Sequence, residues 1–199
     1  MSLHPLPQDH VGAVVTSLAM TQRPLDENQD QPASDAPLRV RTWRGIEPSA
    51  YRALFRKVGA RWLWYSRLAM RDAELAAAIG EVHVMENVGG EAVGFFELDV
   101  SRADVCLIRF LGLVPELAGK GHGPWVFRQL LTRAWRPGVT RVEVNTCSLD
   151  HPAALPAYLK AGFRVVGRSL ESFPDPRLTG LLPRDCAPQI PLLGTDGSG

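Results

Sequence analysis

The sequence predicts an α+β fold of ordinary globular size. Apolar and polar residues alternate in several short segments, as in half-buried strands. Segments with helical periodicity lie between them, and a glycine-rich turn joins a long apolar strand to a helix. The 199 residues are enough for one core, and 45% hydrophobic with 22% charged residues is typical of a globular protein.

The first part of the chain predicts a strand, a linker and then a strand–helix pair. Residues 11–20 are consistent with a short strand, and residues 21–37, rich in Gln, Asp, Asn and Pro, indicate a linker or loop. Alternation over residues 38–43 predicts a strand. Apolar residues at helical spacing over 47–58 predict a helix that ends at Gly59.

An aromatic and basic segment follows at residues 60–68. It is consistent with a short helix packed on the core and equally with the wall of a substrate pocket, because Trp and Tyr combine apolar area with a polar group. A helix through Ile79, with Asp72 as its cap, comes next. Residues 82–88 and 92–100 then predict a hairpin with a tight turn at Gly89 and Gly90.

The apolar segment 105–114 predicts a central strand, in which Gly112 indicates a bulge or a close backbone approach. Gly119, Gly121 and Gly123 follow at alternate positions, and Pro124 stands where a helix would begin. A loop of this kind at a helix N-terminus binds phosphate through backbone N–H groups, although it is also consistent with a simple tight turn.

The rest of the chain predicts a helix after the glycine loop, a strand over 142–147, a helix within 150–162 and a last strand over 163–173. Pro156 would kink the second helix unless it begins near Ala154. Residues 174–199 contain five prolines and indicate an irregular tail.

Two motifs in this order resemble the GCN5-related N-acetyltransferase (GNAT) superfamily. The first is Ala118-Gly-Lys-Gly-His-Gly123 after Val114-Pro-Glu, similar to the family pattern Gln/Arg-x-x-Gly-x-Gly/Ala. The second is the run His151–Phe163, which is similar to Asn-x-x-Ala-x-x-x-Tyr-x-x-x-Gly-Phe, with His151 in place of Asn. The resemblance covers residues 38–173, with 1–37 as an N-terminal strand and linker and 174–199 as the tail.

The resemblance implies a central mixed, mostly antiparallel sheet, flanked by helices on both faces and splayed at its central strand pair. It also implies acetyl-CoA, or another short acyl-CoA, as the cofactor. The residues that it assigns to the cofactor are Leu111, Leu113, Val114, Gly119, Lys120, Gly121, His122, Gly123, Pro124, Ala154 and Tyr158.

Ala118 departs from the family pattern, which has Gln or Arg at this position. A side-chain contribution to phosphate binding is therefore missing, and Lys120 replaces part of that charge as a point charge rather than a planar fork. His122 stands at a position that is usually small or apolar, where it would contact a phosphate or point into solvent.

The implied reaction is direct attack of a primary amine on the thioester of acetyl-CoA. It needs a base for the amine and a proton donor for the leaving thiolate. Tyr158 is the candidate acid by resemblance, with stacking as a packed helix residue as its other role. Glu97 is the candidate base because a carboxylate among aromatic residues holds its proton more tightly, and it is equally consistent with a solvated charge on the face of the sheet. Asp99, Glu116 and Asp150 are alternative bases, although Asp150 is more typical of a helix cap.

The acceptor is expected to be a small-molecule amine or a peptide. By resemblance, its pocket is built from the first helices and the hairpin. The residues assigned to it are Trp62, Trp64, Tyr65, Arg67 and Phe95. Aromatic walls beside Arg67 indicate a ligand with an apolar or anionic part.

Several other functions are disfavoured by the sequence. A net charge of +1 provides no general attraction to nucleic acid or anionic membranes, and neither is expected as a partner. No signal peptide or membrane span is recognised, so a cytoplasmic location is expected. The three scattered cysteines indicate free thiols without metal-ligand spacing, and no metal is expected. A homodimer is left open.

Other catalytic motifs fit poorly. The loop lacks the Gly-x-Gly-x-x-Gly spacing of dinucleotide-binding proteins and the Lys-Ser/Thr pair of NTPases, and no Gly-x-Ser-x-Gly element is present. Cys147 and His151 have the residue types of a nucleophile pair, at a spacing that is usually coincidental. The main alternative to an enzyme is a non-catalytic acyl-CoA sensor or protein-interaction module.

Overall fold

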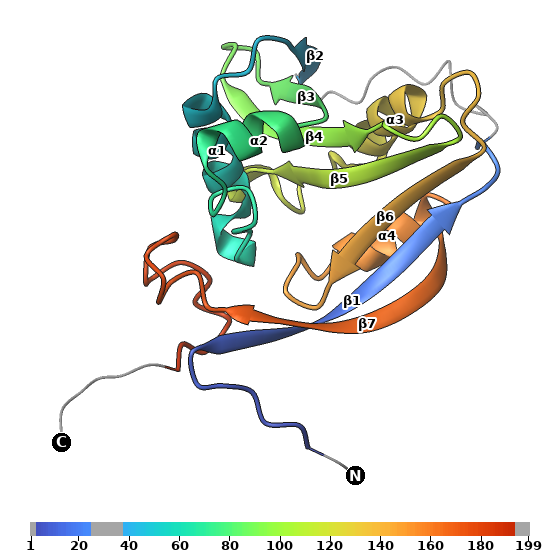
Figure 1. The fold of residues 1–199 in the computed structure, drawn as a ribbon. Coiled ribbons are helices and arrows are strands. Elements are labelled where there is room, and N and C mark those ends of the chain that lie inside the picture. Colours follow the sequence, from blue (N-terminus) through green and yellow to red (C-terminus); the bar gives the residue numbers. More distant parts are fainter. Residues whose placement is uncertain (1–2, 25–37, 194–199) are drawn as a thin grey trace, which may run out of the picture.

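The computed structural model describes residues 3–24 and 38–193 of the chain. One seven-stranded sheet runs through this part of the molecule, with helices on both of its faces (Figure 1). The predicted α+β class with a mixed sheet is therefore confirmed. Most of the predicted linker, at residues 25–37, and the end of the predicted tail lie outside the described residues.

The elements follow the predicted order. The strands are β1 (His10–Met20), β2 (Arg39–Trp43), β3 (Glu81–Glu86), β4 (Ala92–Asp99), β5 (Val105–Leu113), β6 (Arg141–Cys147) and β7 (Arg164–Pro174). The helices are α1 (Pro48–Gly59), α2 (Asp72–Ala78), α3 (Gly123–Ala134) and α4 (Ala154–Lys160), with short 3-10 helices η1 (Ala60–Trp62) and η2 (Pro115–Leu117). Neighbouring strands lie in the order β2-β3-β4-β5-β6-β1-β7, and only the β5–β6 pair is parallel.

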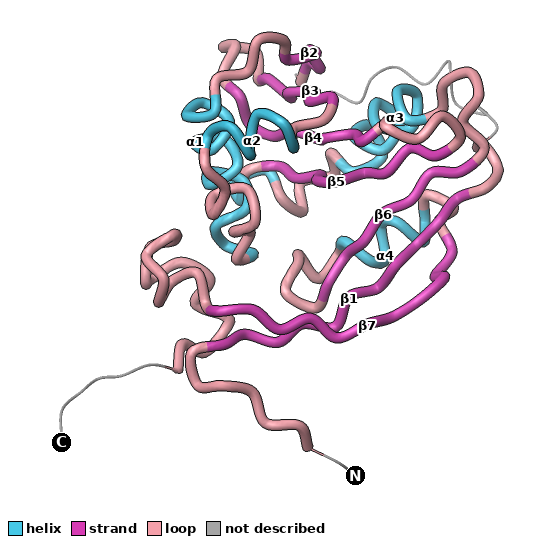
Figure 2. Tube along the Cα trace, in the orientation of Figure 1, coloured by secondary structure: helices cyan, strands magenta, loops and turns pink. Residues whose placement is uncertain are grey.

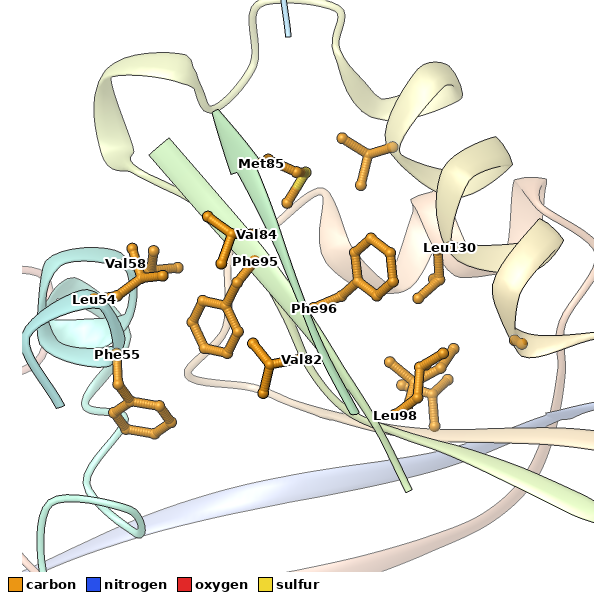
Figure 3. Close-up of a cluster of buried hydrophobic side chains, with 14 of the residues drawn as sticks. Leu54, Phe55, Val58, Val82, Val84, Met85, Phe95, Phe96, Leu98 and Leu130 are labelled. Carbon is orange, nitrogen blue, oxygen red and sulfur yellow. The ribbon is translucent and has the colours of Figure 1, made fainter. Parts of the chain in front are cut away.

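Strand β4 is buried on both faces, which explains its nearly continuous apolar sequence. Successive side chains of a strand point to opposite faces. Phe95 therefore packs toward Phe55 and Val58 of α1, and Phe96 points to the other side, toward Leu130 of α3 (Figure 3). The five side chains are each no more than 1% exposed. This core fixes α1 and α3 on the two faces of the sheet.

The predicted N-terminal strand is confirmed, and it lies at a place that the sequence pattern does not indicate. β1 is inserted between β6 and β7 and pairs antiparallel with both, with Val15 opposite Cys147 on one side and Ser169 on the other. Figure 1 shows β1 and β7 running side by side as a long ribbon. The sheet thus continues across the boundary predicted at residue 38.

The bulge predicted at Gly112 lies instead at Arg109. Glu97 pairs with Phe110 and Leu98 with Ile108, which leaves Arg109 as the extra residue of β5. At Gly112 itself, side chains rather than another backbone segment approach closely. A Cβ atom there would lie 2.5 Å from Val58 Cγ1 and 3.1 Å from Trp64, so a side chain at this position would force α1 away from the sheet.

Three local predictions need correction. The β3–β4 connection is a longer loop rather than a two-residue turn, and Asn87 Oδ1 accepts hydrogen bonds from the Gly89 and Glu91 N–H groups. Asp72 is the first residue of α2, not its cap. Asp150 precedes α4, which begins at Ala154, so Asp150 is not its cap either. That start keeps Pro156 in the first turn, as the sequence required.

The described part of the tail, from Asp175 to residue 193, is irregular but packed. Arg177 and Asp175 form a buried ion pair at 2.7 Å, and Arg177 Nη1 also donates to the Ile190 carbonyl at 2.9 Å. Gln189 Nε2 donates to the Arg61 carbonyl at 2.6 Å, which ties the tail to η1. No helix in residues 3–24 and 38–193 is long and apolar enough to cross a membrane.

Candidate active site

A cavity of about 590 Å³ lies where β5 and β6 separate. The two strands pair only from Val105 opposite Arg141 to Ile108 opposite Val144. Beyond that point they diverge, as Figure 2 shows, and residues 109–113 and 145–147 line the two sides of the opening. The splayed central pair implied by the family resemblance is therefore present.

The glycine loop forms one end of the cavity. Gly119 and Gly121 have φ values of 75° and 81°, in the left-handed region that favours glycine. A Cβ atom at either position, or at Gly123, would meet nothing within 4 Å. In the described part of the chain, no backbone hydrogen bond uses the N–H of Gly121, His122 or Gly123 as donor. The three residues line the cavity at the start of α3, where N–H groups without a backbone partner are available to an anion.

The other residues assigned to the cofactor divide into two groups. The structure places one group on the cavity wall: Leu111, Leu113, Gly119, Gly121, His122, Gly123, Pro124, Ala154 and Tyr158. Two residues lie off the wall. Val114 is buried and its N–H donates to the Val93 carbonyl at 2.8 Å, and Lys120 is exposed at the loop surface. Ala118 lines the cavity without a polar side chain.

Tyr158 lies in the wall on α4 with its ring packed edge-on against Phe127 and Phe163, at centroid distances of 5.2 and 5.5 Å. Only 6% of the residue is exposed. Burial, followed by the negative charge of Asp150, raises the pKa of the phenol well above its usual value. The hydroxyl therefore keeps its proton and can act as a hydrogen-bond donor at neutral pH.

Three aromatic residues assigned to the acceptor line the cavity opposite the glycine loop: Trp62, Trp64 and Tyr65. The segment thus fulfils both interpretations of its sequence, because Leu63 and Leu68 beside them are buried in the core. Trp64 Nε1 donates to Asp150 Oδ1 at 3.2 Å.

Two further ring contacts fix this wall. Trp62 packs edge-on against His151 at 5.2 Å. Tyr65 stacks on Phe173 of β7 at 4.6 Å. The wall is therefore assembled from η1, the loop after β6 and the last strand.

Glu97, the candidate base, does not face the cavity. Its carboxylate is fully buried and accepts hydrogen bonds from the Tyr51 hydroxyl, from Arg67 Nη2 at 2.5 Å and from the Gly80 N–H at 3.2 Å. Phe95 is also buried in the core, away from the wall. Because Arg67 and Glu97 neutralise each other inside the protein, the anionic acceptor group inferred from Arg67 loses its basis.

The alternative bases are no better placed. Asp99 lies outside the wall and binds Arg109 at 2.6 Å. The hydrogen bond from Ser101, together with Arg109, lowers the pKa of Asp99 to about 2. Glu116 is exposed outside the cavity.

Asp150 does line the cavity, but both of its oxygens are occupied. Besides Trp64, it accepts hydrogen bonds from Thr146 Oγ1 at 2.8 Å and the Cys147 N–H at 2.9 Å. These contacts hold the turn after β6.

Cys147 and His151 both line the cavity but do not form a reactive pair. Burial and the charge of Asp150 raise the pKa of the Cys147 thiol to about 11, so the thiol stays protonated. His151 Nδ1 accepts a hydrogen bond from the Ala153 N–H at 3.0 Å, which orients its ring toward Trp62.

Sequence reasoning missed one charged residue of the wall, Glu171 on β7. Its neighbour two positions on, Phe173, lies on the same face of the strand and also lines the cavity. The alternation along residues 163–173 marks the strand. It gives no indication that this face meets the cavity, which depends on β1 separating β7 from β6.

A sequence model of the acetyltransferase (GNAT) family matches residues 42–163. The chain belongs to this family. The match includes β3, β4, the splayed strand β5, the glycine loop, α3, β6 and α4, and it ends before β7. A comparison with curated proteins gave no match.

Solved structures with the GNAT fold are similar to the chain. A GCN5-related N-acetyltransferase from Sphaerobacter thermophilus has a TM-score of 0.55 and 19% identity, over 81% of this chain and 51% of that one. The chain thus spans about half the length of that protein. A GNAT family acetyltransferase from Elizabethkingia anophelis with acetyl-CoA bound has a TM-score of 0.52 and 15% identity, over 66% of this chain and 78% of that one.

An IAA acetyltransferase from Bacillus cereus is also similar, with a TM-score of 0.50 and 22% identity over 65% of this chain and 79% of that one. These likenesses concern the fold. The identities of the acceptors are not transferable at such distances.

Proposed function

We propose that this GNAT protein is an acetyl-CoA-dependent N-acetyltransferase that acts on a primary amine by direct attack. One observation carries the proposal. The opening between β5 and β6 leads from the glycine loop at the start of α3, past Tyr158, to a second wall of aromatic residues. Such a passage provides a place for a phosphate-bearing cofactor at one end and for an acceptor at the other.

The residues of the loop fit the pyrophosphate of coenzyme A. The free N–H groups of Gly121, His122 and Gly123 lie where α3 begins, and the helix dipole favours negative charge there. Side-chain volume is absent at Gly119 and Gly121, so backbone and phosphate can approach closely. Lys120 adds positive charge at the surface of the loop, which partly replaces the polar side chain missing at Ala118.

The edge of β5 fits the pantetheine arm. On one side β5 pairs with β4 as far as Leu113, and on the other its pairing with β6 stops at Ile108. Main-chain groups of residues 109–113 therefore face the opening without a strand partner. Leu111 and Leu113 would bind the arm through these groups, as an added strand does.

Bound acetyl-CoA would supply the thioester whose acetyl group is transferred. The acceptor amine attacks as the neutral form, so it first releases a proton to a base or to water. Tyr158 would donate its hydroxyl hydrogen to the sulfur that leaves. The raised pKa makes this phenol a weaker acid, so its hydrogen is transferred only as negative charge develops on the sulfur, and the packed ring holds the hydroxyl in place.

The test uses the purified full chain with acetyl-CoA and a panel of amino acids, polyamines, aminoglycosides, arylalkylamines and peptides, and it measures the free thiol released. Amine-dependent thiol release is expected. A rise in thermal stability with acetyl-CoA but no release with any amine would instead identify a non-catalytic acyl-CoA-binding module. Absence of both effects would contradict cofactor binding itself.

A further inference from the structure

The wall opposite the glycine loop has the chemistry of a site for an organic cation. Tyr65 and Phe173 are stacked, Trp62 stands beside them against His151, and all four residues line the cavity. Aromatic faces carry partial negative charge and attract ammonium groups, while their area binds apolar groups.

Glu171 adds a full negative charge to this wall. It is exposed and lines the cavity, and no hydrogen bond or ion pair involves its carboxylate within residues 3–24 and 38–193. Its charge acts on two other groups of the cavity. After burial, the charge of Glu171 raises the pKa of Tyr65, and it also contributes to the raised pKa of Cys147 at the end of β6. Glu171, Tyr65 and Cys147 therefore line the same cavity within electrostatic range of one another.

Other charged groups near this wall are already paired, apart from Arg61, which lies over the Trp62 ring at 5.8 Å and does not line the cavity. Arg67 is bound to Glu97 in the core, and Arg109 is bound to Asp99. Asp150 is held by Trp64, Thr146 and Cys147. Glu171 is the charged side chain of the wall that remains to recognise a ligand, and its sign selects a cation.

We infer that Glu171, with Tyr65 and Trp62, binds the ammonium form of the acceptor, and that the acceptor is a primary amine with an aromatic or bulky apolar body and no carboxylate beside the amine. The inference rests on the proposed function, because it assigns the acceptor end of the same cavity. A carboxylate on the ligand would meet Glu171 with like charge, whereas an ammonium group forms a charge-assisted hydrogen bond to it.

The probes are 2-phenylethylamine, phenylalanine and ethylamine. The first two share a ring and a primary amine, and phenylalanine adds a carboxylate; ethylamine lacks the ring. We expect 2-phenylethylamine to have the lowest KM of the three. In Glu171→Gln, its KM should rise about tenfold or more, with kcat changed less than about threefold and the KM of acetyl-CoA unchanged. Glu171→Lys should reverse the preference toward phenylalanine.

The matched control is Glu91→Gln, which removes the same charge from a surface residue paired with Lys57, outside the cavity. It should leave all three KM values unchanged. Circular dichroism and the melting temperature show whether each variant is folded.

Calorimetric titration of 2-phenylethylamine into the CoA-saturated protein measures acceptor binding without turnover. Binding weakened by Glu171→Gln supports the inference even if no amine releases thiol, a result that would contradict only the proposed function. The inference is overturned if thiol release has the same KM values in the wild type and in both Glu171 variants. It is also overturned if the wild-type protein does not bind 2-phenylethylamine.

Discussion

Trp64 donates through Nε1 to Asp150 Oδ1 at 3.2 Å and so joins the segment after η1 to the turn after β6. These segments belong to the two halves of the sheet, which separate beyond Ile108 and Val144. The hydrogen bond therefore links the two sides of the opening at a point where no strand pairing joins them.

Trp64→Phe should loosen this connection while keeping an aromatic ring in place. A hydrogen bond to a charged group contributes about 1.5–3 kcal/mol, and we expect the free energy of unfolding to fall by about that amount. Urea denaturation measures the change. Trp43→Phe, on strand β2 far from the opening, is the control. If the free energy of unfolding falls equally in the two variants, the hydrogen bond to Asp150 does not contribute to stability.

Tyr158→Phe should separate catalysis from cofactor binding. The ring contacts with Phe127 and Phe163 remain, so the melting temperature and the Kd of acetyl-CoA should stay unchanged. Loss of the donor should lower kcat by about 10²–10⁴-fold. Thiol-release assays measure kcat, and calorimetry measures the Kd of acetyl-CoA. If kcat and cofactor affinity fall together, the residue acts through packing.

Gly123→Ala should weaken cofactor binding without destabilising the free protein. Gly123 has no positive φ, and a Cβ atom there meets nothing within 4 Å, so the added methyl group occupies only the open space of the loop. We expect a higher Kd for acetyl-CoA at an unchanged melting temperature.

Gly121→Ala is the matched comparison, because its φ of 81° makes an alanine strained by about 1–2 kcal/mol. It should lower stability as well as affinity. If Gly123→Ala binds acetyl-CoA with unchanged affinity, the phosphates of the cofactor do not lie against this loop.

Glu97→Ala should lower the free energy of unfolding but leave the activity of the folded protein intact. Removing one partner of a buried ion pair costs about 3–5 kcal/mol, because Arg67 is then buried with its charge uncompensated. The kcat of the folded fraction and its pH profile should stay close to wild type. A large fall in kcat at full stability would restore Glu97 as the base. The double variant Glu97→Leu/Arg67→Met should be more stable than either single one.

Acid should destabilise the protein through His83. The residue is 5% exposed and stacks on Phe96, and burial, followed by the charge of Arg133, lowers its pKa from 6.5 to about 4. Since the unfolded chain takes up the proton first, stability is fully present above pH 6.5 and is lost as the pH falls toward 4. The difference between a pKa of 6.5 in the unfolded chain and about 4 in the folded protein corresponds to about 3 kcal/mol of the free energy of unfolding.

Urea denaturation between pH 7 and pH 4 measures this loss for the wild type and for His83→Phe. The variant lacks the titrating group and should have a smaller pH dependence over that range. An unchanged slope would mean that carboxylates elsewhere cause the acid sensitivity.

Local patterns predict the strands, the helices and the start of α4 near Ala154, because they depend on residues a few positions apart. The positions of Glu97 and Arg67 could not be predicted in this way. Each has the residue type of a functional group, and their mutual neutralisation appears only when β4 and the segment after η1 are packed together. Glu171 was missed for the same reason, since its role depends on where β7 lies in the sheet.

The strand order β6-β1-β7 also sets the sequence of events in folding. β1 precedes every other strand of this sheet in the sequence, but both of its hydrogen-bonding neighbours come from residues beyond 140. Its backbone donors and acceptors therefore remain unpaired until late in synthesis, and contacts of such long sequence separation form slowly. The half of the sheet that carries Glu171 and Phe173 is thus completed last, and the aromatic wall is the last part of the cavity to assemble.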